Sequence, residues 1–327
     1  MNFGNLSGQD IQFSQTYNNS LHLNPALAGA TRKTRAMLHH RTQWHQLDAN
    51  YISSMAGGDH YSEKLNSGFG LYFLYDQQGQ TILNSYEIAA QYAYEVVLKQ
   101  NIVVRFGLQG TLVNRSLDYT KLIFPDQIDN QGNVGNTQVD LEQISTKTTN
   151  GDFSSGIVVY GNRIWGGYSA HHLNRPTTSF VGNTTRWPIK HTFISGYKYY
   201  IQEPSKTLNE KSITPTAHYK MQGKSDQFDL GIFGIYYPAM IGVWYRGIPF
   251  LKQYNTRLQN NESLSMMIGA KFKQAQFSYS YDIVASKLAP ARTGGSHEIN
   301  VIYYFTPFKK ARKPMKRLPC PELFDEK

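Results

Sequence analysis

Apolar and polar residues alternate with a period of two along most of this chain. Residues 102–113 show the pattern well, with one face carrying Ile102, Val104, Phe106, Leu108 and Leu112, and the other carrying Arg105, Gln109 and Thr111. Residues 277–283 and 298–305 repeat it. Because successive side chains of a strand point to opposite faces, the pattern predicts β-strands with one apolar and one polar face.

Counting such segments predicts about fourteen strands. Their expected spans are 35–47, 51–56, 66–76, 81–98, 101–117, 152–160, 163–173, 189–200, 212–222, 225–236, 241–248, 261–272, 274–284 and 294–305. Several exceed ten residues, about the length that a tilted strand needs to cross a bilayer. A soluble sandwich or propeller is the alternative, but we find no propeller repeat of about 40–50 residues. We therefore expect an all-β fold, a transmembrane antiparallel barrel of the outer membrane, over residues 35–305.

The expected connections alternate between long and short. With a periplasmic N-terminus, the outer connections include 118–151, 174–188, 249–260 and 285–293, and the inner ones include 99–100, Gly161-Asn162 and the join near Lys273. Long outer loops and tight inner turns are typical of bacterial barrels. The connections 57–65 and 201–211, long and on the inner side, depart from this rule, as does the short outer connection 77–80.

The composition agrees with a membrane barrel. Charged residues make up only 17% of the chain, against roughly 25% in ordinary soluble domains, and aromatic residues make up 13%. No run of 18 apolar residues exists, which excludes a transmembrane helix. The start, MNFGNLSGQD, lacks the features of a signal peptide, so we expect that such a segment was trimmed or the start misassigned.

The net charge of +10 does not indicate nucleic-acid binding, because much of the excess lies in one segment. Residues 309–317 read KKARKPMKR, with six positive charges in nine residues. A solvated tail and a contact with a partner or anionic lipid remain alternatives. The single cysteine, Cys320, excludes an intrachain disulfide.

The N-terminal part of the chain resembles a known family. Gln9 to Gly29 reads QDIQFSQTYNNSLHLNPALAG. This is similar to the mature start of the PorP/SprF family, Q-D-P-x-F-S-Q followed by N-P-A-x-A-G, with Ile11 in place of the usual proline. The resemblance continues to the last strand through Arg41 to Trp44, Gly68 to Gly79, Tyr92 to Tyr94, Gly167 to Leu173, Tyr245-Arg246, Tyr281-Asp282 and Gly295 to Glu298.

The resemblance implies an accessory outer-membrane protein of type IX secretion and gliding motility in Bacteroidota. Such proteins help secreted proteins with a type B C-terminal domain to reach and stay on the cell surface, and other members contact periplasmic components. We accordingly expect a periplasmic segment at residues 1–34, the barrel at 35–305 and a basic periplasmic tail at 306–327. The expected partners are a secreted surface protein or adhesin, periplasmic secretion components, and outer-membrane lipid and lipopolysaccharide.

Charged residues on the polar faces of the strands are expected to form a network in the lumen. Arg246, Asp282 and Glu298 lie on inward faces by alternation, and Asp152 is a further candidate. A charge that faced lipid at the bilayer midplane would cost roughly 2–4 kcal/mol for Arg. The network is therefore interpreted first as structural, and second as a pore or docking site. Whether loops or a plug close a barrel of this width is left open.

Residues for partner binding are expected in the long connections and the tail. The candidates in the connections are Phe124, Asp126, Arg175, Trp187, Tyr254 and Arg257, and those in the tail are Lys309, Arg312, Cys320 and Phe324. The longest connection, 118–151, is rich in Asn, Gln, Thr and Asp, and it is either a contact surface or a lid over the barrel mouth.

Two other functions compete with partner docking. One is a diffusion porin for small solutes, and the other is an outer-membrane hydrolase that uses Ser169 and His171. These two residues share a strand face, but no G-x-S-x-G turn accompanies them. The adjacent His171 and His172 should point to opposite faces, so they cannot both ligate one metal from a regular strand. We expect no catalysis, cofactor or metal.

Overall fold

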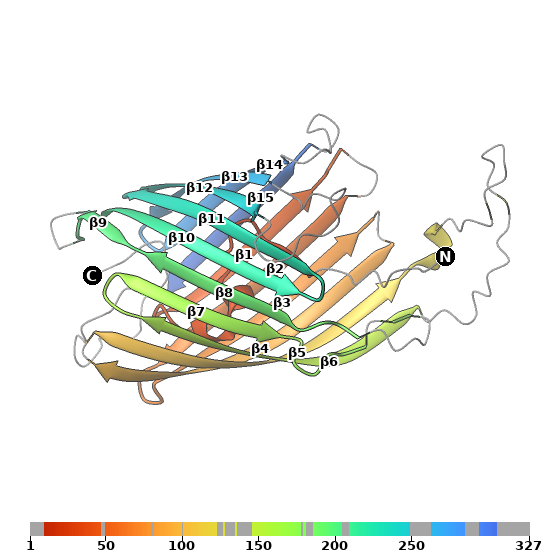
Figure 1. Ribbon diagram of the computed structural model, residues 1–327, viewed down its shortest axis with the longest axis horizontal. Helices are drawn as coiled ribbons and strands as arrows, with labels where there is room; N and C mark the ends of the chain where they lie inside the picture. Colours follow the sequence, from red (N-terminus) through yellow and green to blue (C-terminus); the bar gives the residue numbers. More distant parts are fainter. Residues whose placement is uncertain are drawn as a thin grey trace.

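The computed structural model is a closed antiparallel β-barrel (Figure 1). It describes residues 10–46, 50–79, 82–99, 101–122, 127, 135, 146–177, 179–180, 186–204, 209–248, 263–284 and 294–305. The strands are β1 (Thr34–Gln43), β2 (Tyr51–Ser62), β3 (Ser67–Gln78), β4 (Leu83–Lys99), β5 (Ile102–Leu117), β6 (Lys147–Tyr160), β7 (Ile164–His171), β8 (Lys190–Tyr197), β9 (Tyr199–Gln202), β10 (Lys211–Gln222), β11 (Ser225–Tyr236), β12 (Ala239–Ile248), β13 (Ser263–Phe272), β14 (Ala275–Val284) and β15 (Ser296–Phe305). Short helices are α1 (Ser20–Leu23), η1 (Pro25–Leu27) and η2 (Tyr119–Lys121).

The first and last strands close the barrel, because β1 pairs with β15 from Thr34 opposite Phe305 to Gln43 opposite Ser296. Both β8 and β9 pair with β10, and only Lys198 separates them, so together they form one strand of a fourteen-stranded barrel. Pro215 of β10 lies between the two pairings. Proline has no N–H to donate to a neighbouring strand, which agrees with the interruption here. The predicted barrel and its fourteen strands are confirmed.

Two strands are longer than predicted. One is β6, which begins at Lys147 and not at residue 152, so the connection predicted at 118–151 ends at residue 146. The other is β2. The sequence analysis ended it at residue 56 and expected a long connection at 57–65, whereas β2 continues to Ser62. Gly57 and Gly58 of β2 lie close against the neighbouring strands. A Cβ on Gly57 would lie 2.8 Å from Tyr72 Cβ, and one on Gly58 would lie 2.7 Å from Arg35 O. The connection between β2 and β3 is therefore short.

The alternation predicted from sequence separates the two surfaces of the wall. Large apolar side chains cover the outer surface, where Leu108 is 63% exposed and Ile268 is 62% exposed. Polar side chains of the same strands are buried in the lumen, among them Arg105, Gln109 and Asp282. An apolar exterior over a polar interior is the arrangement of a barrel that lipid surrounds. No helix among the described residues is long and apolar enough to cross a membrane.

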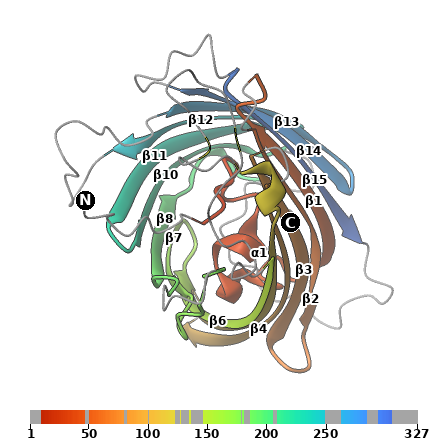
Figure 2. The same ribbon diagram turned by 90° about the vertical axis from the view of Figure 1, so that its right-hand side faces the viewer.

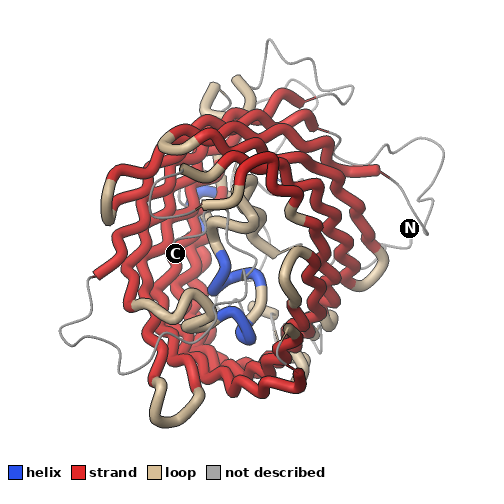
Figure 3. Tube along the Cα trace, turned by 90° about the vertical axis from the view of Figure 1, so that its left-hand side faces the viewer, coloured by secondary structure: helices blue, strands red, loops and turns tan. Residues whose placement is uncertain are grey.

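The N-terminal segment occupies the lumen. Residues 10–33, here called the plug, include α1 and η1 and lie inside the ring of strands (Figures 2 and 3). The rim that holds Thr34 and Phe305 is called the terminal rim. The opposite rim, with the connections 118–146 and 172–189, is called the loop rim. The sequence analysis expected residues 1–34 as a periplasmic segment, but the part described, from Asp10 onward, lies within the barrel.

Candidate functional site in the barrel lumen

The plug is anchored to β15 by consecutive backbone amides. Ser14 N donates to Glu298 Oε2 at 2.5 Å, and Gln15 N donates to Glu298 Oε1 at 3.1 Å. The Ser14 hydroxyl donates to Asp282 Oδ2 at 2.5 Å. Hydrogen bonds to a carboxylate are stronger than those between neutral groups. The sequence Phe13-Ser14-Gln15 is thus held by two charged residues of the wall.

Two arginines complete this network. Arg41 of β1 lies 2.9 Å from Asp282 Oδ2 and 3.4 Å from Glu298 Oε2. Arg246 of β12 lies 3.5 Å from Asp282 Oδ2, and it also donates to the Phe13 carbonyl at 3.3 Å. The structure therefore brings together the three residues expected in the lumen, Arg246, Asp282 and Glu298. Arg41, which links Asp282 to Glu298, was missed, although its inward position in β1 was a signal that could have found it.

A second arginine anchor holds the middle of the plug to β4 and β5. Arg105 is fully buried and donates to the carbonyl oxygens of Ala26, at 2.9 Å, and Ala28, at 2.5 Å. The same guanidinium lies 2.6 Å from Glu95 Oε2. The Asn24 side chain accepts from Ala26 N at 2.9 Å and caps η1. The Asn-Pro-Ala-Leu-Ala-Gly run thus folds as a capped turn that presents its carbonyls to a buried cation.

Glycines of the wall provide the space for this turn. A Cβ on Gly68 would lie 1.8 Å from Ala28 O, and one on Gly107 would lie 2.1 Å from Ala26 N. One on Gly156 would lie 2.0 Å from Asn24 Oδ1. Each distance is far below van der Waals contact, so only glycine fits with the plug in place. The plug and wall therefore match in shape as well as in charge.

The plug is also fastened near the terminal rim. Glu95 of β4 binds Arg32 as well as Arg105, and the Tyr61 and Tyr160 hydroxyls donate to it at 3.2 and 3.3 Å. Arg35, at the start of β1, lies 2.7 Å from Asp59 Oδ1. Both carboxylates are nearly fully buried, so water screens these charges little. The Arg32–Glu95 pair ties this end of the plug to the wall, and the Arg35–Asp59 pair joins β1 to β2 beside it.

At the loop rim, the first described residue of the plug is held by three side chains. The Asp10 carboxylate lies 2.7 Å from Lys190 Nζ and 2.9 Å from His172 Nε2, and it accepts from Gln222 Nε2 at 2.8 Å. His172 Nδ1 lies 3.0 Å from Asp152 Oδ2. Burial opposes the charged form of His172, but Asp10 and Asp152 outweigh it and raise its pKa to about 9. The plug therefore starts in a cluster of ion pairs.

His172 lies just beyond the end of β7 and has a positive φ of 61°. The sequence analysis expected His171 and His172 on opposite faces of a regular strand. Both are buried instead, with ring centroids 6.4 Å apart, because the strand ends between them. The described residues hold no group of three or more His, Cys, Asp or Glu that could bind a metal ion.

Trp187, a predicted partner-binding residue, lies against the plug anchor. Its ring stacks on His172 with centroids 4.2 Å apart and an interplanar angle of 11°. The Arg115 guanidinium carbon lies 5.5 Å from the centre of the same Trp187 ring. Arg175 is exposed, and its backbone N–H donates to the His172 carbonyl at 3.0 Å. The other candidates lie outside the described residues: Phe124, Asp126, Tyr254, Arg257, Lys309, Arg312, Cys320 and Phe324.

A cavity of about 650 Å³, here called the vestibule, lies between the plug and the loop rim. Its lining includes Asp10, Glu87, Arg115, Asp152 and Trp187. The lining contains both charged and aromatic side chains, and the plug forms the inner end of the cavity. Among the described residues, the lumen is thus open at the loop rim, and the plug occupies it further in.

Ser169, the candidate nucleophile, contacts the plug. Its hydroxyl donates to the Leu23 carbonyl at 3.0 Å, and the side chain is 1% exposed. A nucleophile needs a base within hydrogen-bond reach and access for substrate. The hydroxyl of Ser169 instead serves as a hydrogen bond between β7 and the plug.

Solved outer-membrane proteins are similar to this chain at low identity. The Ralstonia pickettii toluene transporter TbuX is 11% identical with a TM-score of 0.49, over 87% of this chain and 92% of that one. Acinetobacter baumannii Omp33 is 7% identical with a TM-score of 0.47, over 84% and 98%. A Pseudomonas aeruginosa FadL homologue is 11% identical with a TM-score of 0.47, over 88% and 94%. No curated protein matches the sequence.

The family model described as type IX secretion system membrane protein PorP/SprF matches residues 5–303, nearly the whole chain. The match includes both plug motifs and the wall residues that hold them. With its closed barrel and apolar exterior, this chain is an outer-membrane protein, and it belongs to the PorP/SprF family of type IX secretion system membrane proteins.

Proposed function

We propose that this protein is a closed barrel that docks a secreted surface protein at its loop rim and contacts periplasmic components of type IX secretion at its terminal rim. The cargo proposed is a protein with a type B C-terminal domain. The observation that carries the proposal is the plug, which fills the lumen through buried charges at both ends and a buried arginine in the middle. A barrel closed in this way acts through its surfaces.

The anchoring argues against a diffusion porin. A porin needs a continuous aqueous path, and the plug lies across that path. Removing one partner of a buried ion pair typically costs about 3–5 kcal/mol, and release of the plug would break several such pairs. A resting protein with these contacts is expected to keep its lumen closed.

The loop rim is the proposed docking surface for the secreted protein. It carries the longest connection and the vestibule, whose half-exposed aromatic and charged side chains are typical of protein interfaces. Of the candidates, Arg175 is exposed at this rim, while Trp187 is turned toward His172. Phe124, Asp126, Tyr254 and Arg257 are proposed to contribute from the neighbouring connections.

The tail is proposed to contact the periplasmic components. It follows β15 at the terminal rim and carries Lys309, Arg312, Cys320 and Phe324. A basic segment with several prolines suits an extended contact with an acidic partner surface. No enzymatic role is proposed, because the Ser169 hydroxyl is engaged by the plug and the family is a membrane component of a secretion system.

The test is a pull-down of the tagged chain from native outer membranes in mild detergent, with mass spectrometry of the proteins retained. The Arg175→Glu variant should no longer retain a large secreted protein in the pull-down. The matched control is Arg163→Glu, which reverses an exposed arginine in the turn between β6 and β7 at the terminal rim and should retain it. Deletion of residues 306–327 should lose periplasmic components only. A partner-free protein that conducts ions in planar bilayers would favour a porin instead.

A further inference from the structure

Two opposite charges lie close together in the wall of the vestibule without forming an ion pair. Glu87 of β4 and Arg115 of β5 both line this cavity of about 650 Å³. Glu87 lies opposite Val113 in the strand register, so Arg115, two positions further along β5, is its diagonal neighbour on the inner face. Within the described residues, neither side chain has a hydrogen-bond or ion-pair partner. Both groups are therefore available to a ligand in the cavity.

Aromatic contacts hold the Arg115 side chain in place. Its guanidinium carbon lies 5.6 Å from the centre of the Phe180 ring and 5.5 Å from the centre of the Trp187 ring. Trp187 is itself fixed by its stack on His172. Cation–π contacts do not use up the N–H donors of a guanidinium. The structure thus presents a positioned hydrogen-bond donor beside the Glu87 carboxylate.

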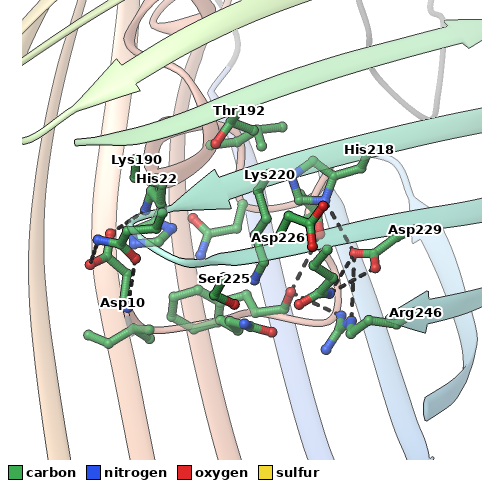
Figure 4. Close-up of a pocket in the computed structure, with 18 residues that line it drawn as sticks. Asp10, His22, Lys190, Thr192, His218, Lys220, Ser225, Asp226, Asp229 and Arg246 are labelled. Carbon is green, nitrogen blue, oxygen red and sulfur yellow. Dashed lines mark hydrogen bonds and ion pairs between the residues drawn. The ribbon is translucent and has the colours of Figure 1, made fainter. Parts of the chain in front are cut away.

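Opposite charges nearer the plug do pair with each other. Along β8, β10 and β11 the plug leaves a cavity of about 70 Å³ (Figure 4). Lys190 lies 2.7 Å from Asp10 there, and Arg246 lies 3.8 Å from Asp229. The two vestibule charges depart from this pattern, although they are neighbours. Because removing charges from water is costly unless they are paired or hydrogen-bonded, a ligand that bonded to both half-buried groups would be favoured.

Buried polar atoms on the next two strands, β6 and β7, also lack partners. Asp152 binds His172 through Oδ2, and its Oδ1 is buried without a hydrogen bond in the part of the chain that the structure describes. The same holds for Nε2 of His171. Asp152 and His171 are 3% and 5% exposed, and both line the vestibule. Because nearly all buried polar groups in proteins are hydrogen-bonded, these atoms indicate a polar occupant of the cavity.

The ligand that fits these groups is neutral and rich in hydroxyl groups. The described lining has five carboxylates against five lysines and arginines, so it selects neither a cation nor an anion. A sugar hydroxyl both donates and accepts, and two adjacent hydroxyls match the paired atoms of a carboxylate or a guanidinium. Trp44 and Tyr51 line the same cavity, edge to face at 5.4 Å, and offer an aromatic surface to the C–H face of a sugar ring.

We propose that the vestibule binds a neutral oligosaccharide, with Glu87 and Asp152 accepting hydrogen bonds from sugar hydroxyls and Arg115 donating to them. The volume of the cavity lies within the range of small-molecule sites, roughly 300–1,000 Å³. The proposal goes beyond the docking of a secreted protein at the loop rim and does not depend on it.

The experiment measures binding to the purified full chain by isothermal titration calorimetry in lauryldimethylamine oxide, a detergent without a sugar headgroup. The probes are the neutral hexasaccharides of glucose, mannose and N-acetylglucosamine, and at least one should bind at one site per barrel. Glu87→Gln removes the carboxylate, and Arg115→Lys keeps the charge but loses the planar fork. Each should weaken binding by about tenfold or more. The matched controls, Glu203→Gln and Arg163→Lys, change an exposed pair at the terminal rim and should bind like the wild type.

Folding is checked by heat-dependent migration in detergent gels, so that only closed barrels are compared. A folded wild type that binds none of the three saccharides would overturn the proposal. Binding that Glu87→Gln and Arg115→Lys leave unchanged would overturn it as well. A capped hexaserine peptide that competes with equal affinity would overturn the saccharide as the ligand class. None of these results bears on the docking proposal, which the pull-down with Arg175→Glu tests separately.

Discussion

The backbone amide of Ser14 donates to the Glu298 carboxylate at 2.5 Å, although 284 positions separate the two residues. This contact joins the first part of the plug to the last strand, which also pairs with the strand that follows the plug. The plug and the closure of the barrel therefore depend on the same region of wall. Closure of the barrel and occupation of the lumen should be coupled.

Glu298→Gln tests this coupling. The substitution removes the carboxylate charge that accepts hydrogen bonds from Ser14 and Gln15 and lies beside Arg41. The free energy of unfolding should therefore fall by about 3–5 kcal/mol. The measurement is the midpoint of urea unfolding in lipid vesicles. Glu203→Gln, which disrupts an exposed pair with Arg163, is the control and should change the midpoint little. Equal midpoints for the two variants would contradict a structural role for the network.

Gly68→Ala should displace the plug without changing any charge. Its Cβ would lie 1.8 Å from Ala28 O, and an overpacked site of this kind costs typically about 1–3 kcal/mol. Limited proteolysis should then cleave within residues 10–33. The control is Gly110→Ala, because nothing lies within 4 Å of a Cβ at that position. Identical digestion patterns would mean that the wall does not hold the plug at this glycine.

The contact between Asp10 and His172 should weaken at high pH. The pKa of His172 is raised above its ordinary value of 6.5 to about 9, so its contribution to stability is complete below pH 6.5 and is lost as the pH rises through 9. Asp10, with a pKa well below 3.8, stays charged throughout this window. The melting temperature should therefore fall between pH 7 and pH 10 more in the wild type than in His172→Gln. Parallel curves of melting temperature against pH for the two proteins would contradict this role of His172.

Trp187→Ala should loosen the loop-rim end of the plug. The indole covers the His172 ring, so its loss admits water to the ion pair with Asp10 and weakens it. Hydrogen exchange should increase in peptides that cover residues 10–16 and not in those that cover residues 24–30. Arg175→Ala, which removes an exposed side chain of the same connection, should change neither. Unchanged exchange after loss of the indole would show that Trp187 does not support the plug.

The sequence by itself determined the barrel wall. The direction of a side chain on a strand depends only on its position along that strand, so alternation assigned Leu108 to the exterior and Arg105, Asp282 and Glu298 to the lumen. The two strands it shortened are β2 and β6, and β2 contains two glycines whose role depends on the neighbours Tyr72 and Arg35. Gln9 to Gly29 resemble the N-terminal motif of a known family. This resemblance identified the motif residues, but it did not indicate where they lie in the fold.

Only the tertiary structure decided where the plug lies. Residues 10–33 carry no alternation, and α1 and η1 are too short to leave a periodic signal. Their partners in the wall are distant in sequence: Glu298, Asp282 and Arg105. The local sequence around the plug residues, or around these partners, does not indicate that they pair. The plug therefore forms when the closed wall brings these charges and the glycine sites around one segment. A long-range fit of this kind is a property of the folded chain, whereas the strand pattern is local.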